Sequence, residues 1–273
     1  MLKVIFLCVN YNSYDALQEY LESINTAKQS CKNEVELKVI VGDNSQKSHQ
    51  INTGKYDFQV EQIIFNQNTG YFGGISSAIK KSDVKLKEYS YIIISNVDVK
   101  VATDFFEQLY IACFNDDIGC IAPSILSRLT GENRNPRLFH RYSLKKINIL
   151  RIMYKIPFVF NVYLRCVSPI KSRFNKVNVA ETKIIYAPHG SFMIFTKKFA
   201  DFLQTMKFPS FLYGEEIFIG EELKKRKLKT VYYPPIKVFD EEHISTGKMK
   251  NRILFKYNYD SLTSIVKEYY QHN

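Results

Sequence analysis

The chain has 273 residues, 45% of them hydrophobic and 24% charged, a composition that supports a sizeable core and excludes a largely disordered protein. Its formal net charge is +11 at pH 7. The excess is concentrated between Arg128 and Asn178, where twelve Lys or Arg stand against one acid, and the remainder is nearly neutral. Charge gathered in one stretch predicts a local polyanionic partner.

The five cysteines are widely spaced and form neither a CxxC pair nor a metal-ligand cluster, which favours a reducing cytoplasm. Cys8, Cys113 and Cys120 stand among apolar residues and are expected to be buried. The chain starts directly with a strand pattern and has no run of about 18 apolar residues. We therefore expect neither an export signal nor a membrane-spanning helix.

The first half of the chain alternates apolar runs with helical patterns. Lys3–Val9 predicts a strand buried on both faces, and Tyr14–Ala27 follows with apolar residues at helical spacing. The next expected elements are the strands Leu37–Val41 and Gln59–Phe65, the helix Gly73–Lys81, the strand Tyr91–Ile94 and the helix Asp104–Phe114. This rhythm predicts an α/β fold with a mostly parallel sheet and right-handed crossovers.

Four short polar turns, all rich in Asn and Asp, follow the four expected strands. They are Asn10–Ser13, Gly42–Ser45, Asn66–Gly70 and Ser95–Asp98. Ligands bind beyond the carboxyl ends of the strands in such sheets, so the four turns are expected to meet at one ligand-binding edge. Asn and Asp are also ordinary turn formers, so a single turn of this kind says little.

Asn96-Val97-Asp98 is the first candidate site. A carboxylate at the sheet edge could hold a divalent cation that also binds a diphosphate. The alternative is that Asp98 caps the next helix, but Thr103 is itself a good N-cap residue. The glycine-rich run Asn68–Gly74 precedes a helix and suits close approach of the backbone to a phosphate, although it can equally be a structural turn.

A basic segment fills the middle of the chain. From Arg134 to Lys176, Arg and Lys alternate with Phe, Tyr, Ile and Leu, a pattern suited to anionic lipid at a membrane interface. Nucleic-acid binding is the rival interpretation, but no recognised nucleic-acid-binding fold accompanies the segment, so we expect no nucleic-acid partner. A dimer contact is a third possibility.

Lys248–Tyr270 predicts an amphipathic helix packed on the domain or on a partner.

Four acids, Glu215, Glu216, Glu221 and Glu222, open a stretch that ends in Lys224–Lys227. Acids at the start of a helix and bases at its end are what the helix dipole favours. Taken alone, the pattern indicates a solvated helix.

Together these motifs resemble family 2 glycosyltransferases, which have the GT-A fold. The nucleotide-binding half is matched by VNYNS (9–13), VGDNSQ (41–46), NQNTGYFGG (66–74) and SNVDV (95–99). An acceptor-side strand, an acidic catalytic motif and a late histidine motif are matched by APHGSFMIFTKKF (187–199), FLYGEEIFIGEELKKRKLKTVYYPP (211–235) and FDEEHIST (239–246). The resemblance is to the rhamnosyl- or galactofuranosyl-transferase type that builds bacterial surface polysaccharides.

The resemblance implies a role for each matching residue. The residues that would bind the nucleotide are Asn10, Asn12, Asp43, Asn68, Gly70 and Asn96, with Asp43 on the base or ribose. Asp98, the second acid of a DXD-like motif, and His243 would hold Mg²⁺ or Mn²⁺ with the diphosphate. Glu216 matches the catalytic base, and Glu215 would contact acceptor or donor. Two positions depart from the pattern, since Asn96 replaces the first Asp and Glu216 stands where Asp is common.

The implied activity is inverting transfer of a sugar from a UDP- or dTDP-sugar to a lipid-linked saccharide, at the inner face of the plasma membrane. The expected organisation is a nucleotide-sugar half (1–125), a basic, membrane- or acceptor-facing insertion (126–180), an acceptor and catalytic half (181–246) and a C-terminal helix (247–273). A nucleotidyltransferase would need a basic glycine-rich loop after the first strand, which VNYNS lacks. A non-catalytic membrane-binding subunit is the other alternative, against which Asp98 and Glu216 count weakly.

Overall fold

The computed structural model describes residues 1–156, 158, 160, 181–241 and 251–271. Within them the strands are β1 (Leu2–Asn10), β2 (Val35–Asp43), β3 (Gln59–Ile64), β4 (Tyr91–Asn96), β5 (Val99–Val101), β6 (Ile118–Ser127), β7 (Lys183–Ile185), β8 (Phe192–Thr196) and β9 (Lys229–Asp240). The helices are α1 (Tyr14–Ser30), α2 (Tyr71–Ser82), α3 (Phe105–Ile111), α4 (Leu144–Lys155), α7 (Ala200–Gln204), α8 (Glu215–Lys225) and α9 (Asn251–Tyr269).

The described strands form one sheet in the order β3-β2-β1-β4-β8-β6-β9-β5, with β7 beside β9. The first four strands are parallel, as their alternation with helices predicts. β8 is inserted antiparallel between β4 and β6, and β9 then runs parallel to β6. The expected mostly parallel α/β fold is confirmed, with the antiparallel strands confined to the second half of the chain.

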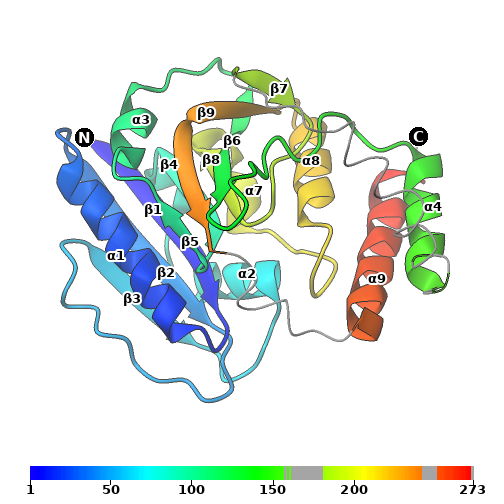
Figure 1. Ribbon diagram of the computed structural model, residues 1–273, viewed down its shortest axis with the longest axis horizontal. Helices are drawn as coiled ribbons and strands as arrows, with labels where there is room; N and C mark the ends of the chain where they lie inside the picture. The colour runs from blue at the N-terminus through cyan, green and yellow to red at the C-terminus, as the bar shows by residue number, and fades with distance from the viewer. Residues whose placement is uncertain (157, 159, 161–180, 242–250, 272–273) are drawn as a thin grey trace.

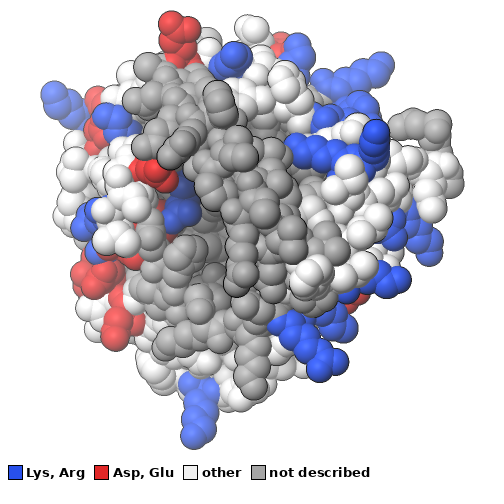
Figure 2. Space-filling view, turned by 45° about the vertical axis from the view of Figure 1, so that its right-hand side comes forward, with Lys and Arg blue, Asp and Glu red and all other residues white. Residues whose placement is uncertain are grey.

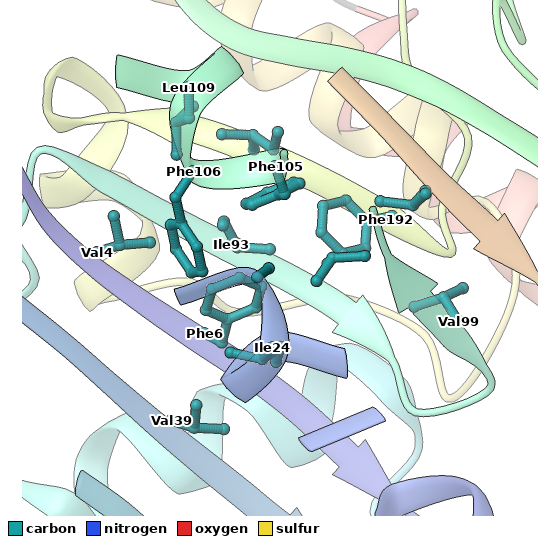
Figure 3. Close-up of a cluster of buried hydrophobic side chains, with 14 of the residues drawn as sticks. Val4, Phe6, Ile24, Val39, Ile93, Val99, Phe105, Phe106, Leu109 and Phe192 are labelled. Carbon is teal, nitrogen blue, oxygen red and sulfur yellow. The ribbon is translucent and has the colours of Figure 1, made fainter. Parts of the chain in front are cut away.

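Helices cover both faces of the sheet (Figure 1). On one face α1 and α3 pack on alternate residues of β1, such as Phe6, and on the other face α2, α7 and α8 pack on residues such as Ile5 and Leu7. The first core contains a group of aromatic rings, Phe6, Phe105, Phe106 and Phe192, whose centroids lie 5.3 to 6.3 Å apart (Figure 3). Strand alternation therefore divides the apolar residues between two cores.

α4 and α9 lie side by side at one end of the molecule, away from the sheet (Figure 1). Ile147 of α4 packs with Leu262, Ile265 and Val266 of α9, and Ile217 of α8 joins the same cluster. The amphipathic C-terminal helix thus packs on this chain's own α4 and α8, the first of the two arrangements expected for it.

Two expectations from the sequence are corrected, and a third, that Asp98 is not a helix cap, is confirmed. Cys113 is exposed, because α3 ends at Ile111 and leaves it in the loop that follows, whereas Cys8 and Cys120 are buried as expected. Asp104, not Thr103, is the N-cap residue of α3. The strand β5 separates Asp98 from that helix, so Asp98 is not its cap.

The helix α8 is not a solvated helix, since Glu221 and Glu222 are each only 4% exposed. The Arg141 guanidinium makes two hydrogen bonds with the Glu221 carboxylate, at 2.7 and 3.1 Å. The Tyr269 hydroxyl donates to Glu222. Both acids therefore join α8 to its neighbours instead of facing water.

None of the helices in the described ranges is both long and apolar enough to span a bilayer.

Candidate active site

The parallel pairing of β1, β2, β3 and β4 brings the four Asn/Asp-rich turns to one edge of the sheet. Asn10 lies beside Asp43 in register, and Val9 lies beside Asn96. Asp43 in turn lies beside Ile64, the last residue of β3, in the parallel pairing of β2 and β3. The edge expected from the sequence pattern is therefore present, and its side chains can be compared one by one.

Asn10 and Asp43 are fully buried at this edge. The Asp43 carboxylate accepts hydrogen bonds from the Tyr14 hydroxyl (2.7 Å), the Gln62 amide (2.9 Å) and the Ser45 backbone N–H (3.0 Å). The Asn10 amide also donates to it, at 3.4 Å. These contacts hold the first three strand ends together from inside, and direct contact of Asn10 and Asp43 with a nucleotide stays a prediction.

Asn12 and Asn68 are exposed, whereas Gly70 is buried. The Asn68 side-chain oxygen accepts from the Gly70 N–H at 2.9 Å and so shapes the turn before α2. Gly70 has φ +78°, and a Cβ atom there would collide with the Phe211 carbonyl in the loop before α8. Only glycine suits this position, and its close approach ties this edge of the sheet to the loop before α8.

Asn96 and Asp98 lie where β4, β5 and β9 meet. The Asn96 N–H donates to the Ser191 carbonyl at 2.9 Å, and the Asp98 carbonyl accepts from the Glu241 N–H at 3.0 Å. Asp98 is 8% exposed. The backbone on both sides of the DXD-like motif is thus fixed by the segments that precede β8 and follow β9.

A divalent cation can be tested against these residues by their donor chemistry. Within the described ranges, no group of three or more His, Cys, Asp or Glu side chains is arranged to hold a metal ion. Mg²⁺ and Mn²⁺ take oxygen ligands, and Mg²⁺ is usually held by one or two carboxylates together with substrate phosphates and water. Asp98 fits that donor set at the open edge of the sheet. His243, the other expected ligand, lies outside the described residues.

Glu215 and Glu216 begin α8 but differ in environment. Glu215 is buried, and its Oε1 accepts from the Tyr213 N–H at 2.9 Å, whereas the Glu216 side chain is 21% exposed. Burial, and then the neighbouring charge of Glu216, raises the pKa of Glu215 to about 8. Burial therefore favours the protonated form of Glu215 at neutral pH.

Gly190 lies between α8 and the first residue of α2. A Cβ atom on Gly190 would lie 3.4 Å from Glu216 Oε1, and the Gly190 carbonyl accepts from the Tyr71 hydroxyl at 3.1 Å. Burial raises the pKa of that hydroxyl well above its usual value, with further contributions from Glu215 and, more weakly, Asp98. The Tyr71 hydroxyl therefore lies within electrostatic reach of both acidic groups.

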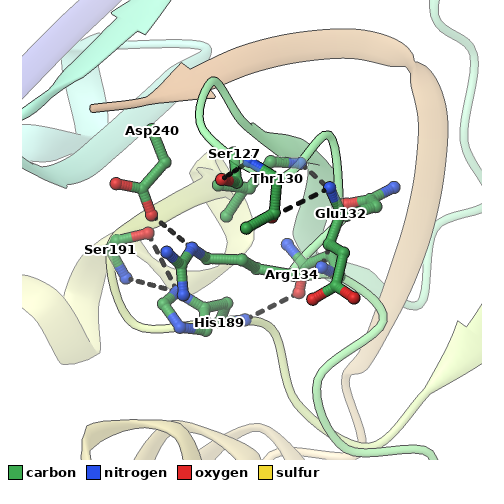
Figure 4. Close-up of polar contacts among 10 residues, drawn as sticks. Ser127, Thr130, Glu132, Arg134, His189, Ser191 and Asp240 are labelled. Carbon is green, nitrogen blue, oxygen red and sulfur yellow. Dashed lines mark hydrogen bonds and ion pairs between the residues drawn. The ribbon is translucent and has the colours of Figure 1, made fainter. Parts of the chain in front are cut away.

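A second polar cluster contains His189 and Ser191, the residues on either side of Gly190, together with Arg134 and Asp240 (Figure 4). The Arg134 guanidinium pairs with the Asp240 carboxylate at 2.5 Å. The His189 backbone N–H donates to the Asn135 side chain at 2.8 Å, and His189 Nδ1 accepts from the Ser191 N–H at 3.2 Å. This cluster joins the loop after β6, the segment before β8 and the end of β9.

His189 is neutral in this setting. Burial is the main reason that the pKa of His189 is lowered, to about 4. The charge of Glu216 raises this pKa, whereas the charges of Arg137 and Arg134 lower it further. Because Nδ1 accepts a hydrogen bond, the neutral ring carries its proton on Nε2. A neutral imidazole with an N–H donor thus lies near the Glu216 carboxylate and both arginines.

Sequence reasoning did not assign His189, Asp240 or Arg134 to the site. The first two lie inside runs that match the family, APHGS and FDEE, but neither run marks them as special. Arg134 was counted only as part of the basic segment. The structure places Asn96 and Glu216 on either side of residues 190–191: Asn96 bonds to Ser191, and Glu216 lies beside Gly190. Asp98 follows Asn96 by two residues and is held by Glu241.

Comparison with known proteins bears on this arrangement. Residues 6–199 match the family model described as glycosyl transferase family 2, which is well over half of the chain. The chain belongs to glycosyltransferase family 2. No curated protein sequence matches this family 2 protein at a significant level.

Solved structures similar to the family 2 protein include GalNAc-T7 with UDP, GalNAc and Mn²⁺, at a TM-score of 0.60 and 13% identity. That match covers 97% of this chain and 48% of GalNAc-T7. Residues 1–349 of S. aureus TarS with UDP-GlcNAc give a TM-score of 0.53 at 12% identity, covering 92% of this chain and 62% of the TarS chain. The family 2 protein therefore spans 48% and 62% of the length of these two chains, and the likeness establishes the GT-A fold.

Proposed function

We propose that this protein is an inverting glycosyltransferase that moves a sugar from a nucleoside-diphosphate sugar to a hydroxyl group of a saccharide. One observation carries the proposal. Glu216 lies beside Gly190, and the next residue, Ser191, bonds to Asn96 at the edge where the four Asn/Asp-rich turns follow their strands. Membership of family 2 supports the same conclusion and speaks against a nucleotidyltransferase.

A UDP- or dTDP-sugar is the proposed donor. The similar structures of GalNAc-T7 and TarS contain UDP and UDP-GlcNAc, which supports this choice. In the proposal, the nucleotide lies over the turns that carry Asn10, Asn12, Asp43, Asn68, Gly70 and Asn96. Asp43 would reach the base or ribose only by exchanging one of its present partners, such as Gln62, for the ligand.

Asp98 is the proposed carboxylate ligand for Mg²⁺ or Mn²⁺, with His243 as a further ligand. A cation bound there would offset negative charge on the departing diphosphate. The Mn²⁺ in the GalNAc-T7 structure supports a divalent cation for this fold. Asp98 itself would fix the cation at the sheet edge, because its backbone is held by Glu241.

Glu216 is the proposed general base. As the acceptor oxygen forms its bond to the anomeric carbon and the bond to the diphosphate oxygen breaks, the acceptor proton passes to the Glu216 carboxylate. A single displacement needs one such carboxylate and inverts the anomeric configuration. Protonated Glu215, neutral His189 and the Tyr71 hydroxyl would surround the reacting groups with neutral hydrogen-bonding partners.

The proposed acceptor is a lipid-linked saccharide reached at an anionic membrane, in the manner of hexosyl-, rhamnosyl- or galactofuranosyl-transferases of surface polysaccharide synthesis. The outer side of α4 supports this, since Ile149, Ile152 and Ile156 are about half exposed and share one helix face with Lys145. α4 carries no acid. Residues 126–180 would then form the membrane- or acceptor-facing insertion between the nucleotide-sugar half (1–125) and the catalytic half (181–246).

The direct test is release of nucleoside diphosphate from a panel of UDP- and dTDP-sugars, with Mg²⁺ or Mn²⁺, in the presence and absence of bacterial membranes as the acceptor source. We expect one donor class to react, with faster release and labelled glycolipid when membranes are added. Binding of sugar nucleotides without any turnover would instead favour a non-catalytic subunit.

A further inference from the structure

Four arginines lie on the connection between β6 and α4, at positions 128, 134, 137 and 141. Three of them pair with an acid on another element: Arg128 with Glu241 at 3.1 Å, Arg134 with Asp240 at 2.5 Å, and Arg141 with Glu221 at 2.7 Å. These three therefore have a structural partner on β9, on the segment just after it, or on α8.

Arg137 differs from the other three. Its Nε lies 4.0 Å from Glu216 Oε1, at the limit of an ion pair, and its side chain is 55% exposed. The acid that it faces is the proposed general base, which must also reach the acceptor. An arginine that served only to hold the fold would be expected to pair closely with an acid that has no other task, as Arg141 does.

The acceptor must approach Arg137 if Glu216 is the base. The reacting hydroxyl has to come within about 3 Å of the Glu216 carboxylate for proton transfer. Groups adjacent to that hydroxyl then lie within reach of the guanidinium, which offers five N–H donors in a planar fork. A neutral acceptor would partly bury the Arg137 guanidinium without offering it a negative charge. Removing a cation from water without such a partner costs free energy.

A phosphate answers this requirement better than a neutral sugar. Arginine binds phosphate oxygens through two parallel hydrogen bonds, a stronger and more directional contact than a lysine makes. Arg134, already paired with Asp240, and Arg137 both act on the His189 ring, whose pKa they lower. The acids Glu216 and Asp240 also face this space, so the positive potential is local to the arginines.

We propose that Arg137 binds a phosphate group carried by the acceptor close to its reacting hydroxyl. This rests on the proposed function, because it takes Glu216 as the base and the saccharide as the acceptor. A phosphate could also come from the donor diphosphate, so the test must separate the two sources.

The experiment measures binding of inorganic phosphate to the whole protein by isothermal titration calorimetry, with and without saturating UDP and Mg²⁺. We expect phosphate to bind with UDP already present, and Arg137→Gln to weaken this binding by about tenfold or more, the usual size for a charge-assisted contact. Arg137→Lys should retain part of the affinity. Arg128→Gln is the matched control, since its arginine is 52% exposed on the same connection, and should change affinity by less than about twofold.

Phosphate that binds only when UDP is absent would assign Arg137 to the donor diphosphate and overturn the acceptor role. Equal losses in Arg137→Gln and Arg128→Gln, or no phosphate binding at all, would overturn it as well. Thermal melting of each variant checks that it is folded. Failure of UDP itself to bind would count against the proposed function, whereas UDP binding without phosphate binding contradicts the phosphate site alone.

Discussion

The two glutamates that open α8 are adjacent in sequence but opposite in chemistry. Glu215 turns into the protein, accepts the Tyr213 N–H and has its pKa raised to about 8, chiefly by burial. Glu216 turns towards Gly190 and is partly open to solvent. Of the two, only Glu216 is accessible to a substrate. It also lies beside Gly190, whose neighbour Ser191 bonds to Asn96. We therefore propose Glu216 as the base.

The first prediction concerns Glu216→Gln. The amide keeps the size of the side chain but cannot accept the acceptor proton, so turnover should fall by roughly 10²–10⁴-fold. Nucleotide affinity, measured by calorimetry, should stay within a few-fold of the parent value. Glu268→Gln, an exposed change on α9, is the control. Near-normal turnover in Glu216→Gln would move the base to another residue.

The second prediction concerns the pH dependence of stability at Glu215. Its pKa is about 8 in the folded protein and near 4.5 when unfolded, so the folded state binds the proton more tightly. The stability contributed by the protonated side chain is complete below pH 4.5 and is lost as pH rises towards 8. Glu215→Gln keeps an acceptor for the Tyr213 N–H but does not titrate. Urea unfolding should therefore show a weaker decline between pH 5 and 8 in the variant, and identical declines would contradict the assignment.

Some of the site could be predicted at this scale and some could not. Asn96, Asp98 and Glu216 follow from motifs in which residue type and spacing are both informative. His189, Arg134 and Asp240 come from three segments far apart in the chain, and their contacts arise only when β6, β8 and β9 pair. The burial of Asp43 could not be predicted either, because it depends on Tyr14 and Gln62 from neighbouring elements.

The elements α4, α8 and α9 are held to one another by buried polar contacts as well as by apolar packing. The Arg141 guanidinium makes its two bonds to Glu221 and a third to the Tyr269 carbonyl at 3.2 Å, and it lies 3.9 Å from the centre of the Tyr270 ring. The Ser261 hydroxyl of α9 donates to the Tyr213 carbonyl at 2.6 Å, just before α8 begins. α9 thereby fixes the start of the helix that carries Glu216.

The third prediction follows from this network. Arg141→Ala leaves the buried Glu221 carboxylate with tyrosine hydroxyls but without its counter-charge, and should lower the free energy of unfolding by roughly 3 kcal/mol. Chemical denaturation measures this. Lys225→Ala, an exposed change at the end of α8, should change stability by less than about 0.5 kcal/mol. Equal stability of the two variants would show that the Arg141 pair contributes no more than a surface charge.

At the scale of elements, the long strands and helices of the first half could be predicted because their apolar residues repeat with the right period. The short strands β5 and β7, three residues each, could not, because three residues carry no measurable periodicity. β5 matters most for the site, because Asp98 lies in the connection between β4 and β5 and not at the N-terminus of a helix. α3 begins at Phe105 and ends at Ile111, one residue after the start and three residues before the end that the sequence predicts.

The molecule as a whole carries its charge unevenly. Lys and Arg side chains predominate on the right-hand part of the view in Figure 2, which is turned so that the end carrying α4 and α9 in Figure 1 comes forward. Half-exposed Ile149 and Ile152 lie among the cations of α4. An apolar row beside positive charge is the pattern of a helix that lies in an anionic membrane surface.

The fourth prediction tests that surface by flotation with vesicles. The protein should float with vesicles containing about 30% phosphatidylglycerol and not with pure phosphatidylcholine, and high salt should reduce the binding. Replacing Ile149 and Ile152 together by Glu should abolish flotation. Ile184→Glu is the control, because Ile184 is 51% exposed but lies on β7. Flotation that does not depend on lipid charge, or that survives the double substitution, would contradict membrane binding through α4.

The central claim is that Asp98 and Glu216 serve one reaction centre, with Asp98 on the side of the donor diphosphate. The most direct measurement is calorimetric binding of UDP and dTDP with and without Mn²⁺, in the parent protein, in Asp98→Asn and in the control Asp104→Asn, whose acid is exposed at the start of α3. We predict tight binding that requires Mn²⁺ in the parent and in Asp104→Asn, and loss of the Mn²⁺ effect in Asp98→Asn. Binding that is the same in all three proteins, with or without the cation, would contradict the account.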